Sequence, residues 1–294
     1  MYKIILFFIV SFGLSCHFSD YRRLEGYDLQ KPDENMVLPA ELHEISGITT
    51  LDEKTLGCIQ DENGVLFFLD ADSKKISREL VFGGDGDYEG IARAGKSVYI
   101  LRSDGNLFEI PDFRMEESET RYHVTNVPAM NNEGLCYDKD NSRLLIGCKG
   151  KIEKGPAYKD RRFIYAFDLK TGQPGTSPVF EFNAAEITRF AVKNGIVPAT
   201  KENKKGKTIN NQIRLNTSEI AIHPITKELY LLSASDHMLM VFNLRGEIQH
   251  IEKLDPLLFN KPEGIAFYNN GDMLITNEGQ QKEPKILRFN FSKH

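Results

Sequence analysis

The sequence predicts an all-β fold, a single β-propeller built from four-stranded blades. Two observations lead to this prediction: a short block recurs at even spacing, and each block opens the same pattern of strand, polar turn and strand. The Ser or Glu of the block stands at positions 46, 89, 133, 218 and 263, so the steps are 43, 44, 85 and 45 residues. A period in the low forties is the length of one propeller blade. No segment has a long apolar period of 3.6 residues, which argues against a helical fold.

The last repeat shows how a blade is expected to begin. Residues 264–268 have the pattern of a strand, and residues 272–276 return after the dipeptide Asn270-Gly271. That dipeptide favours a hairpin turn because both of its residues accept positive φ. Residues 28–38 precede the first block, and we expect them to supply the strand that completes the last blade and closes the ring.

The doubled third step leaves the number of blades open. Residues 150–160 and 184–213 interrupt the repeat with polar, lysine-rich sequence, and residues 185–192 are compatible with a short helix. Five blades with a long excursion is the favoured interpretation, and a degenerate sixth blade is the alternative. The propeller domain is expected to span residues 28–292.

The first 15 residues have the features of a bacterial lipoprotein signal peptide. Lys3 precedes the apolar stretch 4–14, which is too short to span a bilayer. Cys16 follows a small residue and is the expected lipidation site. An ordinary secretory signal is the alternative. In both cases we expect the protein outside the cytoplasm. The lipoprotein interpretation places it in a bacterial cell envelope, with residues 16–27 as a tether and the lipid as its membrane attachment.

Charge and cysteine content narrow the classes of partner. The formal net charge is −5 and the pI is about 5.9, which disfavours a nucleic-acid partner held by phosphate contacts. The basic cluster 201–207 has no interleaved aromatic residues and is interpreted as a solvated loop. Cys58, Cys136 and Cys148 lie within apolar strands, so we expect buried free thiols.

The spacing of the turns predicts which residues meet at one end of the blades. If each hairpin is centred on its turn, one separation of 15 residues fits all five repeats. The expected pairs are Ser46 with Asp61, Glu89 with Asp104, Glu133 with Cys148, Ser218 with Ser233, and Glu263 with Glu278. Because the two strands of a hairpin are antiparallel, these ends converge on one mouth of the central channel, where we expect the functional site.

The chemistry of this mouth is predicted to be acidic. Like charges that face each other across a hairpin are destabilising unless water or a cation compensates them. Oxygen ligands without His or Cys suit Ca²⁺, with Glu89, Glu133, Glu263 and Glu278 as expected ligands. Further ligand-binding candidates are Ser46, Asp61, Glu62, Asp104, Lys149, Ser218 and Ser233. The alternative role for the Glu residues is to accept backbone N–H bonds from neighbouring blades and to lock the ring.

Several of the blocks, taken together in their order, resemble a known family. They are Glu44–Ile48, Gly86–Ile91, Asn132–Leu135, Ser218–Pro224 and Pro262–Phe267. Over residues 27–291 this pattern resembles the SdiA-regulated family of extracytoplasmic bacterial β-propellers, which implies the fold and agrees with a lipoprotein. Glu219 departs from the pattern, because it occupies the place of a Gly. The pattern is also distantly similar to the esterase-like phytases, which keeps an enzyme under consideration.

The function expected from the sequence is a binding or scaffold module with calcium at its acidic mouth, whose partner is an unknown small ligand or an envelope protein. The alternative is a metal-dependent hydrolase of phosphate esters or lactones that uses the same mouth. No catalytic residue is assigned, since the chain has no Gly-x-Ser-x-Gly motif and its histidines lack metal-ligand spacing.

Overall fold

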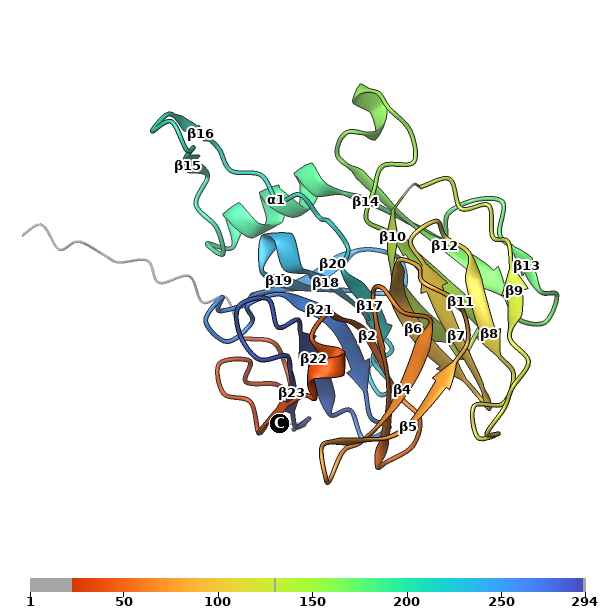
Figure 1. Cartoon of the computed structure of the whole chain (residues 1–294). Helices are drawn as coiled ribbons and strands as arrows, with labels where there is room; N and C mark the ends of the chain where they lie inside the picture. The colour runs from red at the N-terminus through yellow and green to blue at the C-terminus, as the bar shows by residue number, and fades with distance from the viewer. Residues whose placement is uncertain (1–22, 130, 293–294) are drawn as a thin grey trace, which may run out of the picture.

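Five β-sheets form a ring in the computed structural model, which describes residues 23–129 and 131–292. In each sheet the strand that opens the sequence repeat, here called the first strand, lies innermost beside the central channel. The other strands of the sheet lie progressively further out (Figure 1). This arrangement confirms the predicted five-bladed propeller of four-stranded blades.

The bounds of the strands follow the repeat. Blade 1 contains β2 (Ile45–Thr50), β3 (Thr55–Gln60), β4 (Val65–Asp70) and β5 (Lys75–Val81). Blade 2 contains β6 (Tyr88–Ala94), β7 (Ser97–Arg102), β8 (Leu107–Ile110) and β9 (Arg121–His123). Blade 3 contains β10 (Asn132–Asp138), β11 (Arg143–Cys148) and β12 (Arg161–Asp168), whose outer edge pairs with two short strands, β13 (Gln173–Pro174) and β14 (Phe180–Asn183). Blade 4 contains β17 (Glu219–Ile222), β18 (Leu229–Ser233), β19 (Met238–Phe242) and β20 (Ile248–Lys253).

The fifth blade joins the two ends of the propeller. It contains β21 (Pro262–Phe267), β22 (Met273–Asn277) and β23 (Lys285–Phe289), and β1 (Glu34–Val37) pairs with β23 as its outer strand. The predicted closing strand is therefore confirmed. Upstream of it, Tyr27 is buried against blades 4 and 5, and its hydroxyl contacts Gly271 O and lies 2.7 Å from His223 Nε2.

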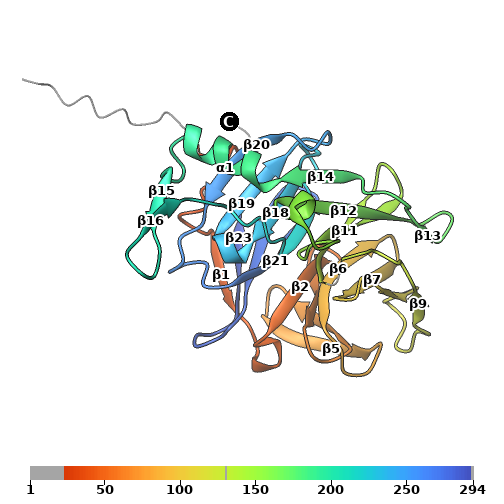
Figure 2. The same cartoon turned by 90° about the horizontal axis from the view of Figure 1, so that it is seen from above.

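The two interruptions of the repeat are excursions, and the ring has no sixth blade. The first contains the short 3₁₀-helix η2 (Pro156–Tyr158), and the second contains α1 (Ala184–Lys193) and the exposed hairpin of β15 (Thr200–Glu202) and β16 (Thr208–Asn210). Two further 3₁₀-helices, η1 (Ala40–Leu42) and η3 (Ala234–Asp236), lie in connections. The hairpin projects from the ring in both Figure 1 and Figure 2. In the part of the chain that the structure describes, no helix has the length and apolar character needed to cross a bilayer.

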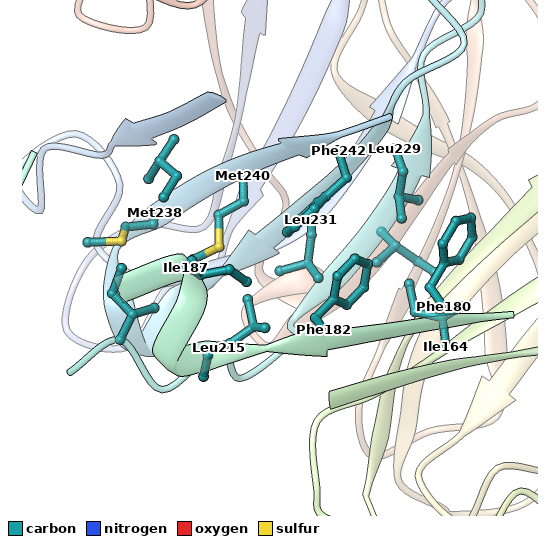
Figure 3. Packing of buried hydrophobic residues seen from close by; sticks show 14 of the residues in the cluster. Ile164, Phe180, Phe182, Ile187, Leu215, Leu229, Leu231, Met238, Met240 and Phe242 are labelled. Atoms are coloured by element: carbon teal, nitrogen blue, oxygen red, sulfur yellow. The ribbon is translucent and has the colours of Figure 1, made fainter. Parts of the chain in front are cut away.

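Helix α1 covers the join between blades 3 and 4. The Asn183 side chain caps it by accepting bonds from the backbone N–H groups of Ala185 and Glu186. Its apolar face places Ile187 beside Met238 and Met240 of β19, as Figure 3 shows. Similar apolar clusters fill the other four joins between neighbouring blades. Cys58, Cys136 and Cys148 lie in these clusters as buried free thiols, as predicted.

The expected pairing at the ends of the first hairpins is wrong in four blades. Bulges lie between Ile45 and Gly47, Tyr88 and Gly90, Asn132 and Gly134, and Pro262 and Gly264. Each bulge inserts one extra residue, so Ser46, Glu89, Glu133 and Glu263 have no direct partner across the hairpin. Cys148, for example, faces Asn132 and not Glu133. Only blade 4 keeps the expected register, with Glu219 opposite Leu232.

Glycine follows each of these bulges because neighbouring first strands approach closely around the channel. A Cβ atom at Gly90 would lie 2.8 Å from Glu133 O and 2.9 Å from Leu135 Cβ. A Cβ at Gly134 would lie 2.9 Å from Ile220 Cγ1. Contacts this short force a shift of backbone, so the glycines set the distance between blades.

We predict that Gly90→Ala lowers the free energy of unfolding by about 1–3 kcal/mol, the usual range for overpacking. Urea unfolding followed by circular dichroism measures the change. Gly84→Ala is the matched control, since no atom lies within 4 Å of the Cβ it would add. Equal destabilisation by the two substitutions would contradict the close approach as the reason for glycine at position 90.

Candidate functional site

A narrow cavity of about 80 Å³ lies at the end of the channel where the first strands begin. We call it the acidic mouth. Its lining residues come from blades 1, 2, 3 and 5, and they are Glu44, Ile45, Ser46, Asp61, Glu89, Glu133, Lys149, Lys261, Glu263 and Glu278. Six carboxylates therefore face two ammonium groups in one small space.

The bulges explain how the acidic side chains reach the mouth. Glu89, Glu133 and Glu263 are the extra residues of three first strands, and a bulge redirects the side chain of its extra residue. Ser46 holds the same place in blade 1, and its hydroxyl donates to Tyr88 O of the next blade at 2.7 Å. One local feature, repeated in four blades, thus supplies four of the lining residues.

Two lysines compensate part of this negative charge. Lys149 Nζ contacts Glu133 Oε1, while Lys261 Nζ contacts Glu278 Oε2 and lies 3.4 Å from Glu263 Oε1. Burial lowers the pKa of Lys149, but the carboxylates of Glu133, Glu263 and Glu89 outweigh burial and raise it overall. Both amines are therefore charged and held in the mouth.

Three carboxyl groups of the mouth are costly to ionise in this setting. Burial, helped by the charge of Glu133, raises the pKa of Glu89 to about 9. Burial raises the pKa of Glu133 to about 7 against the opposing effect of Lys149. Burial, together with Glu44 and Glu278, raises the pKa of Asp61 to about 6. At neutral pH the mouth consequently holds protons that an added cation would displace.

Glu219 extends the acidic group into the channel from blade 4. Its Oε1 accepts the backbone N–H of Leu135 in blade 3 at 2.5 Å and that of Ile220 at 2.9 Å. The Leu135 N–H points away from β11, so the carboxylate lies on the channel edge of β10. Glu219 is only 1% exposed, and its Oε2 has no hydrogen-bond partner within the described residues.

The environment of Glu219 raises the pKa of its carboxyl well above the ordinary value. Burial is the main cause, and the charges of Glu133 and Glu89 add to it. Glu219 itself does not line the acidic mouth. The position of Glu219 in the repeat was the sequence feature that set it apart. The other first strands have a glycine at the corresponding place: Gly47, Gly90, Gly134 and Gly264.

The structure brings together seven of the eleven residues expected at the mouth. Those in the lining are Ser46, Asp61, Glu89, Glu133, Lys149, Glu263 and Glu278. Glu62, Asp104, Ser218 and Ser233 lie outside it. Asp104 is in a turn of blade 2, where its Oδ2 accepts from Arg102 at 2.7 Å. Ser233 Oγ donates to Asp236 Oδ2 at 2.9 Å, and Ser218 Oγ accepts from the Ala234 N–H.

Three residues of the site were missed by sequence reasoning. Glu44 and Lys261 lie immediately before the repeated blocks, so their proximity to the blocks was the available signal. Glu219 was noticed only as a departure from glycine. The proposed lipidation residue, Cys16, lies outside the described residues.

The carboxylates of the mouth do not form a preformed metal site. Across residues 23–129 and 131–292, no group of three or more His, Cys, Asp or Glu side chains is arranged to hold a metal ion. The ammonium groups of Lys149 and Lys261 lie against three of the carboxylates instead. The mouth has the charge that calcium needs but not a preformed set of ligands.

No protein-family model matches the chain, and no curated protein matches it. Among solved structures, it is similar to the glutaminyl cyclase of Myxococcus xanthus, with 13% identity and a TM-score of 0.57 over 90% of this chain and 97% of that one. It is also similar to the PQQ-bound aldose sugar dehydrogenase of Streptomyces coelicolor, with 13% identity and a TM-score of 0.56 over 89% and 98% of the two chains. Such low identity shows the β-propeller fold alone.

We predict that the protein loses stability as pH rises from about 5 to about 9, and that Glu89→Gln weakens this loss. The pKa of Glu89 is raised from 4.5 to about 9, so the folded state keeps a proton that the unfolded chain has released in this window. Each retained proton costs up to about 1.4 kcal/mol for each pH unit. A neutral glutamine removes this dependence.

Urea unfolding at several pH values between 5 and 9 measures the effect. Glu117→Gln is the control, because Glu117 is exposed on the loop after β8. A slope of stability against pH that is unchanged in Glu89→Gln would show that Glu89 does not hold the proton.

Proposed function

We propose that the protein is a binding module whose acidic mouth takes up a small cation. The observation that carries this proposal is the excess of six lining carboxylates over two amines. Carboxylates kept protonated by burial and mutual repulsion gain most from a cation, because it removes both penalties.

The alternative role, in which the Glu residues lock the ring, fits a different residue. Glu219 accepts N–H bonds across two blades, so it suits that role. Glu133, Glu263 and Glu278 lie beside lysine amines instead. These three carboxylates therefore already pair with cationic groups, and the lysine amines stand where a bound cation would lie.

Ca²⁺ is the cation we propose first. It prefers carboxylate oxygens and tolerates irregular coordination, which suits ligands from several blades. Because the mouth has no preformed set of ligands, binding requires the two lysine amines to move away from Glu133 and Glu278. A primary ammonium group is the competing ligand, since the mouth already accommodates two of them.

We also propose that the chain belongs to the SdiA-regulated propellers and works in the bacterial cell envelope, anchored through a lipid on Cys16. The support is the order of the Ser-Gly and Glu-Gly blocks and the composition of residues 1–16. The five-bladed fold agrees with this family without distinguishing it from other propellers.

We predict that Ca²⁺ raises the melting temperature of the purified protein, and that a chelator reverses the effect. A cation present at 100 times its Kd stabilises by about 2.7 kcal/mol. Affinity is expected to increase as pH rises from 6 to 9, because protons on Glu133 and Glu89 compete with the cation.

Glu133→Gln is the test variant, and the exposed Glu117→Gln is the control. Stabilisation by methylammonium and not by Ca²⁺ would assign the mouth to an amine ligand. If neither cation shifts the melting temperature at constant ionic strength, the acidic mouth is not a cation site.

We predict that Cys16→Ser moves the protein from the membrane fraction to the soluble fraction and abolishes labelling with radioactive palmitate in a bacterial host. The thiol of Cys16 is the only group that this substitution removes. Cys148→Ser, at a buried thiol, is the control and should keep the label. Labelling that persists in Cys16→Ser would rule out this residue as the anchor.

A further inference from the structure

The opposite end of the propeller carries a second and larger cavity, of about 690 Å³. It lies between the inner turns of blades 1 and 5 and the loop after β8 of blade 2. Its charged and aromatic lining residues are Arg93, Phe113, Arg114, Tyr268 and Arg288, together with the carboxylates Asp52 and Glu53, and we call it the arginine pocket because three guanidinium groups line it. Because Arg93 and Tyr268 lie at or after the ends of first strands, the pocket opens at the far end from the acidic mouth.

We propose that the arginine pocket binds the phosphate ester of a small organic molecule. Two guanidinium groups, those of Arg93 and Arg114, lie over one aromatic ring, with their central carbons 5.8 Å and 5.2 Å from the centroid of Phe113. Both arginines line the same cavity, and we call Phe113 with these two guanidinium groups the platform. Guanidinium groups pair with phosphate through two parallel N–H bonds, so two of them in one cavity suit a dianionic group.

The loop that carries this platform is held in place from blade 1. Arg78 donates hydrogen bonds to the carbonyl oxygens of Phe113, Arg114 and Met115. Its guanidinium also lies 3.7 Å from the centroid of Phe68. These contacts fix Phe113 and Arg114 before a ligand arrives, which lowers the entropy cost of binding.

The charges of Arg93 and Arg114 are only weakly compensated by the protein. Among the described residues, Arg93 forms no ion pair within 4.0 Å, and Arg114 Nη1 lies 4.0 Å from Asp112 Oδ1, at the limit of an ion pair. The nearby Asp52 already accepts the N–H groups of Lys54 and Thr55 through Oδ1. Burial lowers the pKa of Arg93 and the charge of Arg114 lowers it further, while the charge of Asp52 opposes both effects without outweighing them.

The opposite wall is suited to the organic part of the ligand. The guanidinium carbon of Arg288 lies 5.2 Å from the centroid of Tyr268, and its Nη2 donates to Asp272 at 2.6 Å. The Nε of Arg288 is buried without a hydrogen-bond partner in the described part of the chain. A cavity of this size can hold a whole small molecule. Its aromatic side chains can pack against the organic part of a phosphate ester, which inorganic phosphate lacks.

Isothermal titration calorimetry with glucose 6-phosphate tests the proposal, with glucose and inorganic phosphate as comparison ligands. We expect the ester to bind, glucose not to bind, and inorganic phosphate to bind more weakly than the ester. Arg114→Gln and Arg93→Gln should each weaken binding of the ester at least tenfold. The affinity should fall with added salt.

Arg189→Gln is the matched control, because Arg189 is exposed on α1 and outside the pocket. Urea unfolding of every variant separates loss of the pocket from loss of the fold, and Arg114 is exposed enough to be replaced without cost to the core. Absence of binding at millimolar ester, or equal binding by wild type and both pocket variants, would overturn the proposal.

Discussion

The close approach of neighbouring first strands around the channel is the constraint on which the rest of this propeller depends. A Cβ at Gly90 would lie 2.8 Å from the backbone oxygen of Glu133, so side chains are excluded at this point. The bulge before each glycine directs the preceding Ser or Glu side chain away from the crowded joint. These Ser and Glu side chains therefore extend into the mouth of the channel. The same local pattern therefore closes the ring and gathers acidic side chains at one end.

Gathering these side chains has an electrostatic cost. Glu133 is buried and Glu89 is half-buried, and both have raised pKa values because their charged forms are disfavoured in the folded protein. A role in locking the blades does not require this cost, since a neutral acceptor would serve equally well. Glu219 provides the contrast, because it forms two N–H bonds and still leaves one oxygen unpartnered. This unrelieved cost is the reason for proposing a cationic ligand at the mouth.

The sequence pattern was sufficient to predict the propeller, the closing strand and most of the acidic residues, and to favour five blades over six, because these depend on a repeat that is visible along the chain. It was not sufficient for the pairing of the hairpins, since neither the bulges nor the exact centres of the turns can be recognised in the sequence. In blade 2 the turn is centred one residue earlier than expected, with Ala94 opposite Ser97, and Tyr88 faces Arg102 beside the bulge. Asp104 therefore lies beyond the paired strands, where it accepts a hydrogen bond from Arg102. Glu219 was missed as a site residue because its main contact, Leu135, lies 84 residues away in the chain.

The two ends of the channel are chemically distinct and physically separated. Each first strand contributes one aliphatic residue to the channel beyond its bulge and glycine, and these are Ile48, Ile91, Leu135, Ile220 and Ile265. All five are buried, so they form an apolar layer between the acidic mouth and the arginine pocket. An apolar layer excludes ions, because an unpaired charge there would lose its hydration. A cation that enters the mouth is therefore held at that end, and the anionic ligand proposed for the other end approaches from the opposite face. The two proposed sites would therefore lie at opposite ends of one propeller and take ligands of opposite charge.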